Sequence, residues 1–321
     1  MCGLIDFLES LFPSTPHKAV PESGFPQTVS TFDGHSGDPL IDQPRGPVGG
    51  RTTTRKSLGQ HFLTDSRIAG RILDAADLSP DDLIVEIGPG RGVLTKRLVD
   101  RVKRVVAVEL DPELAAALPE RLDYPANLTY VVADARVVDL AELIAPETSY
   151  KVVANLPYYA ANPIIRRLLE SQPKPEVLVV MVQQEVAKNM VAAPGEMGIL
   201  SVATQFYANA KVVCSVPPRS FRPAPKVTSA IVRLDVLPSP AADVASEEDF
   251  FKVVRAGFAA PRKQLRNSLS QGLRIEPVAG GRILAEAGVD ATRRPQTLDI
   301  DEWAGIYQVW TRSSHHQEGE G

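Results

Sequence analysis

Three acidic residues end three successive apolar runs of the sequence, and together they could bind a nucleoside: Glu86, Glu109 and Asp134. The first acid leads into a glycine-rich turn that contains Gly88, Gly90 and Gly92. Glycines allow positive φ and let a ligand approach the backbone closely. A carboxylate at the end of the second run can accept hydrogen bonds from both hydroxyls of a ribose. If the runs are neighbouring parallel strands, the acids converge on the crevice where open α/β sheets bind ligands.

The spacing of the glycines favours one class of nucleoside ligand over another. It reads G-x-G-x-G, with Pro89 between the first two, whereas dinucleotide enzymes have G-x-G-x-x-G. With Glu86 the segment resembles the E-x-G-x-G-x-G signature of class I S-adenosylmethionine-dependent methyltransferases, whose ligand carries a methionine moiety. In that class the acid at Asp134 binds the exocyclic amine of adenine. A tight strand-to-helix turn without a ligand, with Asp134 as a helix N-cap, is the alternative.

The tetrapeptide Asn155-Leu156-Pro157-Tyr158 ends a fourth apolar run. It resembles the motif of amino-group methyltransferases that act on adenine N6, an amine whose lone pair is delocalised into the ring. The resemblance implies that Asn155 Oδ1 and the Leu156 carbonyl accept the two N–H bonds, that Pro157 stiffens the turn and that Tyr158 stacks on a base removed from its helix. The alternative is a turn with Asn155 as a cap and Tyr158 in the core.

These residues need a frame of strands and helices, which begins at about Arg51. Nearly continuous Val, Ile and Leu runs are typical of strands buried on both faces, and their alternation with helical patterns predicts a mostly parallel, Rossmann-like α/β sheet. The runs are 82–88, 104–110, 128–134, 150–156 and 177–183, and the helical stretches between them include 91–101, 111–122 and 161–171. Two later runs, 210–216 and 229–235, leave no room for a crossover helix and predict an antiparallel edge pair.

The sequence predicts three segments along the chain. Residues 1–50 hold seven prolines and six acidic against two basic residues, a composition that predicts a largely disordered extension. Residues 51–238 form the methyltransferase-like domain. Residues 239–321 form a small all-helical domain with a frayed C-terminal tail, with helices expected at 246–258, 261–272, 280–288 and 299–312.

Composition excludes several classes of protein. The only cysteines are Cys2 and Cys214, so neither a disulfide framework nor a four-ligand zinc site is expected, and a reducing cytoplasm fits. No window approaches the ~18 apolar residues of a membrane span. The formal net charge is −4, but local basic clusters attract phosphate more effectively than a global average does.

Three further motifs extend the resemblance over about residues 55–310: KSLGQHFL (56–63), FRPAPKV (221–227) and RKQLRNSL (262–269). Together they resemble the ribosomal RNA adenine dimethyltransferase family, in its bacterial small-subunit (16S) branch. The resemblance implies S-adenosylmethionine as cofactor, no metal, and N6,N6-dimethylation of two adjacent adenosines in a hairpin near the 3′ end of that RNA. It also implies small-subunit rRNA or an immature 30S subunit as partner, and we expect a monomer.

The resemblance also assigns roles to residues. His61 and Leu63 help to enclose the cofactor, together with Glu86, Gly88, Gly90, Gly92, Glu109, Asp134 and Asn155. Phe221 lies against the target base opposite Tyr158; a core aromatic is the alternative. Arg262, Lys263 and Arg266 fall on one short helix and contact the RNA backbone, or form a merely solvated basic face.

Three other functions are alternatives for this sequence. A relative that methylates large-subunit rRNA and confers antibiotic resistance shares the fold and the catalytic logic, but the 262–269 motif favours the small-subunit enzyme. A non-catalytic ribosome-assembly factor would not need the intact glycine-rich loop, Glu109 and the 155–158 turn. An NAD oxidoreductase has no catalytic constellation in this sequence.

Overall fold

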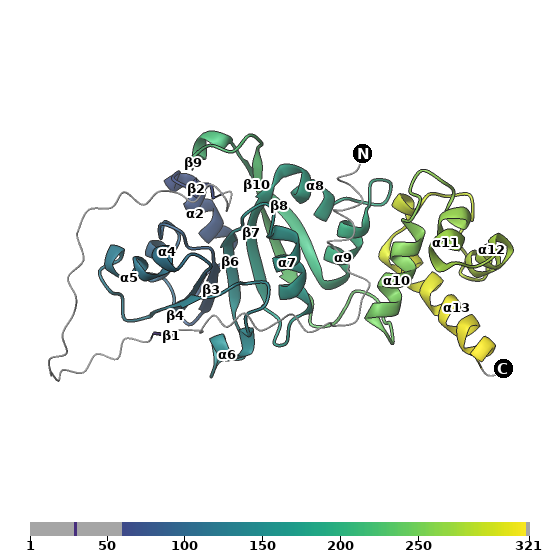
Figure 1. Ribbon diagram of the computed structural model, residues 1–321, viewed down its shortest axis with the longest axis horizontal. Helices are drawn as coiled ribbons and strands as arrows, with labels where there is room; N and C mark the ends of the chain where they lie inside the picture. Colours follow the sequence, from purple (N-terminus) through teal and green to yellow (C-terminus); the bar gives the residue numbers. More distant parts are fainter. Residues whose placement is uncertain (1–28, 31–59, 319–321) are drawn as a thin grey trace. The chain divides into compact units, whose positions relative to one another are not determined.

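A computed structural model describes residues 29–30 and 60–318, with side chains from residue 60 to residue 313. Among these residues, eight strands form one sheet in the order β1-β5-β4-β3-β6-β7-β10-β8 (Figure 1). Its central strands are parallel neighbours and match the predicted apolar runs: β3 (Leu83–Ile87), β4 (Arg104–Glu109), β5 (Leu128–Val132), β6 (Lys151–Asn155) and β7 (Val177–Gln183). The predicted Rossmann-like sheet is therefore confirmed.

The two ends of the sheet have different origins. The runs predicted as an edge pair are β8 (Ala208–Val216) and β10 (Ser229–Val236), which are hydrogen-bonded neighbours at one end. At the other end, β1 (Val29–Ser30) pairs antiparallel with β5. The rest of the predicted extension over residues 1–50 lies outside the described residues. A separate two-stranded sheet joins β2 (Phe62–Leu63) to β9 (Phe221–Arg222).

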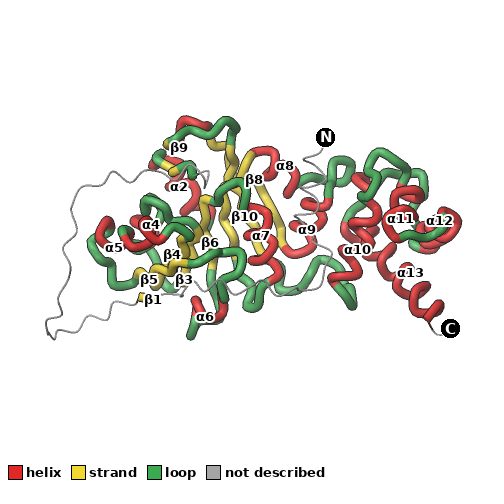
Figure 2. Tube along the Cα trace, viewed as in Figure 1, coloured by secondary structure: helices red, strands yellow, loops and turns green. Residues whose placement is uncertain are grey.

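Helices follow most of the strands, and Figure 2 shows helical segments on either side of the sheet. Asp65, Asp111 and Asp139 cap three of them by accepting backbone N–H groups of the first turn. The helices are α2 (Ser66–Ala75), α3 (Thr95–Leu98), α4 (Pro112–Ala116), α5 (Leu118–Arg121), α6 (Leu140–Ile144), α7 (Ala161–Glu170), α8 (Gln184–Met190) and α9 (Ile199–Tyr207), followed by a 3₁₀ turn at Pro218–Ser220.

Two predicted helices are shorter than the sequence suggested. The stretch 91–101 is helical only in α3, because Gly92 has φ of +79° and the chain turns before the helix begins. The stretch 111–122 divides into α4 and α5 at Ala117. Pro119 lacks the N–H that would continue the first helix.

The described residues form two compact units. One holds the described residues up to Val182 together with Ser215–Ile231, and the other holds Gln183–Cys214 together with the described residues from Val232. The predicted boundary at residue 238 lies just after β10. Residues 183–214 group with the later helices because Phe206 stacks on Phe250, with ring centroids 4.7 Å apart.

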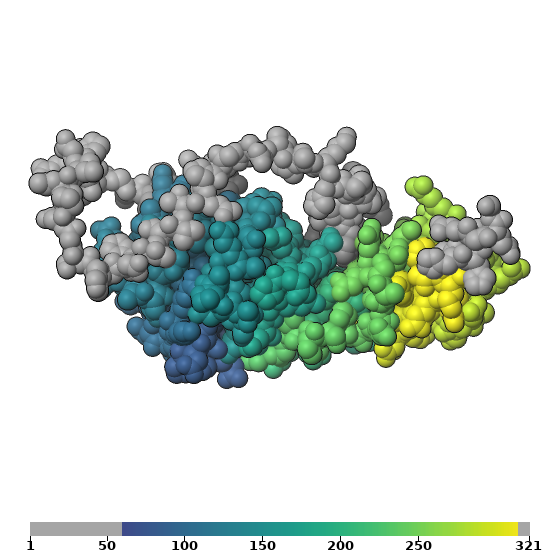
Figure 3. Space-filling model, turned by 90° about the horizontal axis from the view of Figure 1, so that it is seen from below, coloured from purple at the N-terminus to yellow at the C-terminus, as the bar shows by residue number. Residues whose placement is uncertain are grey.

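The second unit is mostly helical and has its own core. In Figure 3 the atoms of its later part, coloured green to yellow, pack together. Gly257 lies so close to the buried Trp303 that an added Cβ would meet the ring at 2.3 Å. The later helices are α10 (Glu247–Gly257), α11 (Leu265–Leu273), α12 (Pro277–Glu286) and α13 (Ile300–Glu318), with a 3₁₀ turn at Pro295–Thr297.

Candidate functional site

The carboxyl ends of β3, β4, β5 and β6 surround one pocket in the first unit. Most of the residues predicted to bind a cofactor or a base line this pocket. They are His61, Gly88, Gly90, Glu109, Asp134, Asn155, Leu156, Pro157, Tyr158 and Phe221. Leu63 and Glu86 line a smaller adjoining pocket instead, and Gly92 lines neither.

At the glycine-rich turn the pocket is lined by backbone without side chains. Gly88 and Gly90 have φ of +71° and +56°, which side-chain-bearing residues rarely adopt. A Cβ on Gly90 would lie 3.1 Å from the Phe62 ring, so the turn also packs closely against that ring. Gly92 is needed for packing, because a Cβ there would lie 2.9 Å from Leu118 Cδ1.

Glu109 joins the glycine-rich turn to the end of β4. Its Oε2 accepts the Gly90 N–H at 3.1 Å and its Oε1 accepts the Asp111 N–H at 3.1 Å. Burial raises the pKa of Glu109, and the backbone hydrogen bonds from Asp111 and Gly90 oppose that rise. Each oxygen keeps acceptor capacity for a hydroxyl group, since a carboxylate offers about four lone-pair sites.

Asp134 is not a helix N-cap. It stands in a turn after β5 in which the Val137 and Val138 N–H groups both donate to its carbonyl at 3.0 Å. Its carboxylate forms an ion pair with Arg136, with 2.6 Å between Nη2 and Oδ2. Hydrogen bonding from the Arg136 side chain lowers the pKa of Asp134, so the group is an anionic acceptor in the pocket.

Glu86 is buried near the carboxyl end of β3, with 1% of its surface exposed. Desolvation raises its pKa to about 8. Its Oε2 has no hydrogen-bond partner among the described residues. A buried carboxyl group with a spare oxygen is costly unless a ligand completes it, and the adjoining pocket shares Gly88, Gly90 and Asn155 with the larger one.

The 155–158 turn closes the other side of the pocket. Asn155 Nδ2 donates to the His61 carbonyl at 3.3 Å, and this orientation leaves Oδ1 as the end of the amide that can accept a ligand N–H. The His61 ring is held by Pro223, with 2.8 Å between Nδ1 and the carbonyl oxygen.

Two aromatic rings at this side of the pocket are fixed in place. The Tyr158 hydroxyl lies 2.6 Å from Ser229 Oγ, and its ring centroid lies 5.8 Å from that of His61. Phe221 is 5% exposed but lines the pocket. Both rings are therefore available to a ligand as well as to the core.

The structure corrects the placement of the predicted RNA-binding residues. Arg262 and Lys263 precede α11 in a turn, and only Arg266 lies on the helix. The helix begins late because its first N–H groups bond to the 291–293 loop: Leu265 donates to the Arg293 carbonyl at 2.7 Å and Arg266 donates to the Ala291 carbonyl at 3.2 Å. All three basic side chains are exposed.

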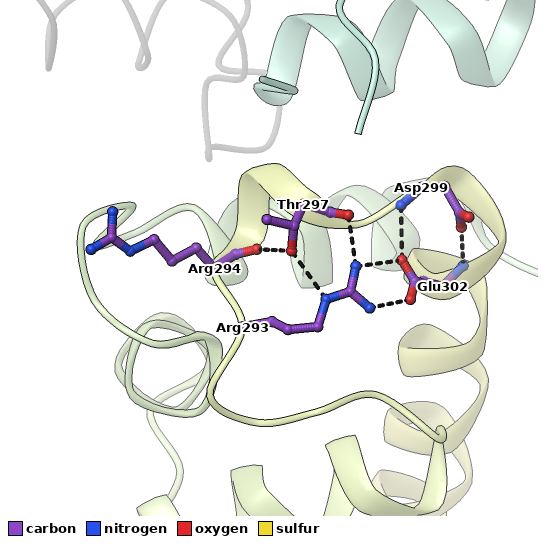
Figure 4. A network of polar contacts seen from close by, with 5 residues as sticks. All are labelled: Arg293, Arg294, Thr297, Asp299 and Glu302. Carbon is purple, nitrogen blue, oxygen red and sulfur yellow. Dashed lines mark hydrogen bonds and ion pairs between the residues drawn. The ribbon is translucent and has the colours of Figure 1, made fainter. Parts of the chain in front are cut away.

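The loop that positions α11 is itself anchored by one arginine. The guanidinium of Arg293 bonds to both carboxylate oxygens of Glu302 and to the Thr297 carbonyl (Figure 4). Glu302 in turn accepts the Asp299 N–H at 3.1 Å at the start of α13. The basic residues therefore stand on a fixed backbone.

Sequence reasoning missed part of the pocket lining. Leu110 and Tyr159 line the pocket and are 44% and 56% exposed, and Ala135 and Arg136 also line it. Leu110 and Ala135 each directly follow one of the three acids. Residues in that position lie at the same sheet edge, which is the signal that could have identified them.

No metal site or membrane span accompanies the pocket in the described part of the chain. Within it, no three His, Cys, Asp or Glu side chains are grouped so that they could hold a metal ion. None of its helices is both long enough and apolar enough to cross a membrane.

Comparisons with known proteins agree on one family. The family model for ribosomal RNA adenine dimethylase matches residues 51–305. The chain is 44% identical over 259 residues to ribosomal RNA small subunit methyltransferase A of Dehalococcoides mccartyi (strain ATCC BAA-2266 / KCTC 15142 / 195), covering 81% of this chain and 89% of that protein. It is 46% identical to the protein of that name from Pelotomaculum thermopropionicum, covering 78% and 90%.

Two solved structures resemble the chain over most of its length. The 23S rRNA methyltransferase ErmE has a TM-score of 0.63 at 30% identity, covering 77% of this chain and 98% of that one. A dimethyladenosine transferase from Plasmodium falciparum has a TM-score of 0.69 at 24% identity, covering 79% and 98%, and supports the fold.

Proposed function

The chain belongs to the ribosomal RNA adenine dimethylase family, and on this premise we propose that it dimethylates N6 of two adjacent adenosines in 16S rRNA. As a member of this family it is an S-adenosylmethionine-dependent RNA methyltransferase. The observation that carries the proposal is that one pocket holds both Glu109 and Asp134, which suit a nucleoside cofactor, and the 155–158 turn, which suits an adenine amine.

The chemistry of the pocket fits the cofactor. Glu109 is positioned to accept the ribose hydroxyls, and Asp134 to accept the adenine amine. The bare backbone of Gly88 and Gly90 allows close approach, and the spare oxygen of Glu86 suits the ammonium group of a methionine moiety. His61 and Leu63 complete the enclosure. When bound, S-adenosylmethionine supplies an electrophilic methyl group on its sulfonium.

The 155–158 turn would prepare the target amine. Asn155 Oδ1 and the Leu156 carbonyl accept the two N–H bonds, which favours a pyramidal nitrogen with an available lone pair. Tyr158, fixed by Ser229, and Phe221 hold the base from its two faces. No general base is required before transfer, because the nitrogen releases its proton after the new bond forms. The rest of the catalysis is in-line positioning.

The choice of RNA is supported by the relatives. Those at 44% and 46% identity carry the small-subunit name, whereas the large-subunit enzyme of similar fold is 30% identical. Within the proposal the enzyme acts as a cytoplasmic monomer on immature 30S subunits, near the 3′ end of 16S rRNA. The helical region after residue 238 supplies RNA contacts through Arg262, Lys263 and Arg266.

The experiment that tests this function is methyl-group incorporation into immature 30S subunits, with large subunits as the comparison substrate. We expect N6,N6-dimethyladenosine at two adjacent positions of 16S rRNA. Incorporation into large-subunit RNA alone would favour the antibiotic-resistance type of enzyme. Binding of subunits without any methyl transfer would favour a non-catalytic assembly factor.

A further inference from the structure

Arg136 makes an unusually complete set of contacts with a single carboxylate. Its Nε lies 3.0 Å from both oxygens of Asp134, and its Nη2 lies 2.6 Å from Oδ2. Its backbone N–H donates to Oδ1 at 2.9 Å. A carboxylate has about four lone-pair sites, and Arg136 directs three N–H groups at them, with the Nε–H shared between both oxygens, so it occupies most of the hydrogen-bonding capacity of Asp134.

This arrangement conflicts with the role proposed for Asp134. The cofactor's adenine amine must find an acceptor on this carboxylate, and the guanidinium competes with it for the carboxylate oxygens. The Arg136 side chain is 48% exposed, against 26% for Asp134, so the guanidinium can move toward solvent while the acid stays in the pocket wall.

The released guanidinium would remain beside the entry for the target base. Arg136 and Tyr159 line the same pocket, and the turn that carries Arg136 is tied to α7, the helix that follows the 155–158 turn. The tie is Arg167, whose Nη2 donates to the Val137 and Val138 carbonyls at 3.3 and 2.5 Å. A guanidinium in such a place is suited to bidentate contact with a phosphate.

We propose that Arg136 is a positioning residue that couples the two substrates: it holds Asp134 in the free enzyme and, when the cofactor's adenine takes Asp134, binds a phosphate beside the target adenosine. The proposal rests on the proposed function. It makes cofactor and RNA binding mutually favourable, and such coupling must be equal in both directions. Because an exposed ion pair contributes little, we expect about two- to fivefold effects.

The first test uses S-adenosylhomocysteine as a non-reactive probe, titrated by calorimetry without RNA. Arg136→Met removes the competitor for Asp134 and should tighten binding by about two- to fivefold. Arg136→Lys loses the forked donor geometry of the guanidinium but keeps the positive charge, and should tighten probe binding less. Arg71→Met, on an exposed arginine of α2 outside the pocket, is the matched control and should bind as the wild type does. Equal affinity in wild type and Arg136→Met would overturn the proposal.

The second test measures binding to immature 30S subunits with and without S-adenosylhomocysteine over a range of salt. In the wild type the probe should raise affinity about two- to fivefold and steepen the salt slope by about 0.7–0.9, the value of one phosphate contact. Arg136→Met should show neither change, and Arg136→Lys should keep the steeper slope. A probe-dependent slope in Arg136→Met would overturn the proposal.

The same subunits separate this proposal from the proposed function. If the wild type methylates them but shows no coupling, only the role of Arg136 is wrong. If the wild type transfers no methyl group to them, the proposed function fails, and the role of Arg136 fails with it. Thermal unfolding of each variant identifies any that do not fold.

Discussion

Glu109 is the residue through which the cofactor half of the pocket can be tested quantitatively. It is 6% exposed, and its two oxygens already hold the Gly90 and Asp111 N–H groups at 3.1 Å each. Glu109→Ala removes the acceptor for the ribose hydroxyls and also frees the glycine-rich turn. One hydrogen bond to a charged group contributes ~1.5–3 kcal/mol. Its loss weakens S-adenosylmethionine binding by roughly 10- to 150-fold, at ~1.4 kcal/mol for each factor of ten.

Calorimetric titration with S-adenosylmethionine measures this loss directly. The affinity of Glu109→Gln should lie between those of the wild type and Glu109→Ala. Its amide keeps one acceptor oxygen, but its NH₂ group faces a backbone N–H that the second carboxylate oxygen accepts in the wild type. Asp111→Ala is the matched control, because Asp111 caps α4: its Oδ1 accepts the Glu113 N–H at 2.9 Å. The substitution should lower the free energy of unfolding by ~1 kcal/mol and leave cofactor affinity within about twofold. Unchanged affinity in a folded Glu109→Ala protein would refute the assignment.

Three further predictions concern Glu86, the basic residues and Tyr158. The pKa of Glu86 is raised from 4.5 to about 8, so the unfolded chain loses this proton at a lower pH than the folded protein does. The free energy of unfolding of the cofactor-free protein should therefore decrease as the pH rises from about 5 to 8, by at most ~1.4 kcal/mol per pH unit. Glu86→Gln should flatten that slope in denaturant titrations. Reversing Arg262, Lys263 and Arg266 to glutamate should weaken subunit binding and flatten its salt dependence without changing cofactor affinity, whereas an unchanged salt slope would make them a solvated face. Tyr158→Ala should reduce capture of the target RNA in single-turnover assays, whereas Tyr158→Phe keeps the stacking ring and should have a much milder effect. Equal losses in the two variants would instead show that the Tyr158 hydroxyl, which contacts Ser229, is the group that matters.

Most of the sheet and much of the pocket could be predicted because strong local patterns encode them. Buried parallel strands need continuous apolar runs, so β3 to β7 stand out in the sequence. The acids that follow such strands share one edge by the geometry of the sheet alone. Asn155 and Tyr158 were singled out because their tetrapeptide resembles a known motif, and both line the pocket.

What could not be predicted depends on contacts between distant residues. The late start of α11 follows from its hydrogen bonds to residues 291 and 293, which no local pattern reveals. The grouping of residues 183–214 with the later helices depends on the stacking of Phe206 on Phe250. The pairing of Arg136 with Asp134 is close in sequence, but its significance emerges only when both line the pocket.

Asn155 is proposed to prepare an adenine amine for methyl transfer, and Asn155→Ala tests this role most directly. Its Nδ2 contact with the His61 carbonyl is a single hydrogen bond of 3.3 Å, so the fold and most of the cofactor affinity should survive. The lost acceptor acts mainly as the amine becomes pyramidal, so the rate constant should fall more than KM rises. By analogy with the removal of one preorganised hydrogen-bonding group in other enzymes, the loss should be ~10²–10³-fold or more.

The decisive measurement is nucleoside mass spectrometry of 16S rRNA after single-turnover reactions with wild type and Asn155→Ala. We expect N6,N6-dimethyladenosine from the wild type and almost no methylated adenosine from a variant that still folds and binds S-adenosylmethionine. A fully active Asn155→Ala enzyme, or methyl groups on cytosine or on ring nitrogens of adenine, would contradict this expectation.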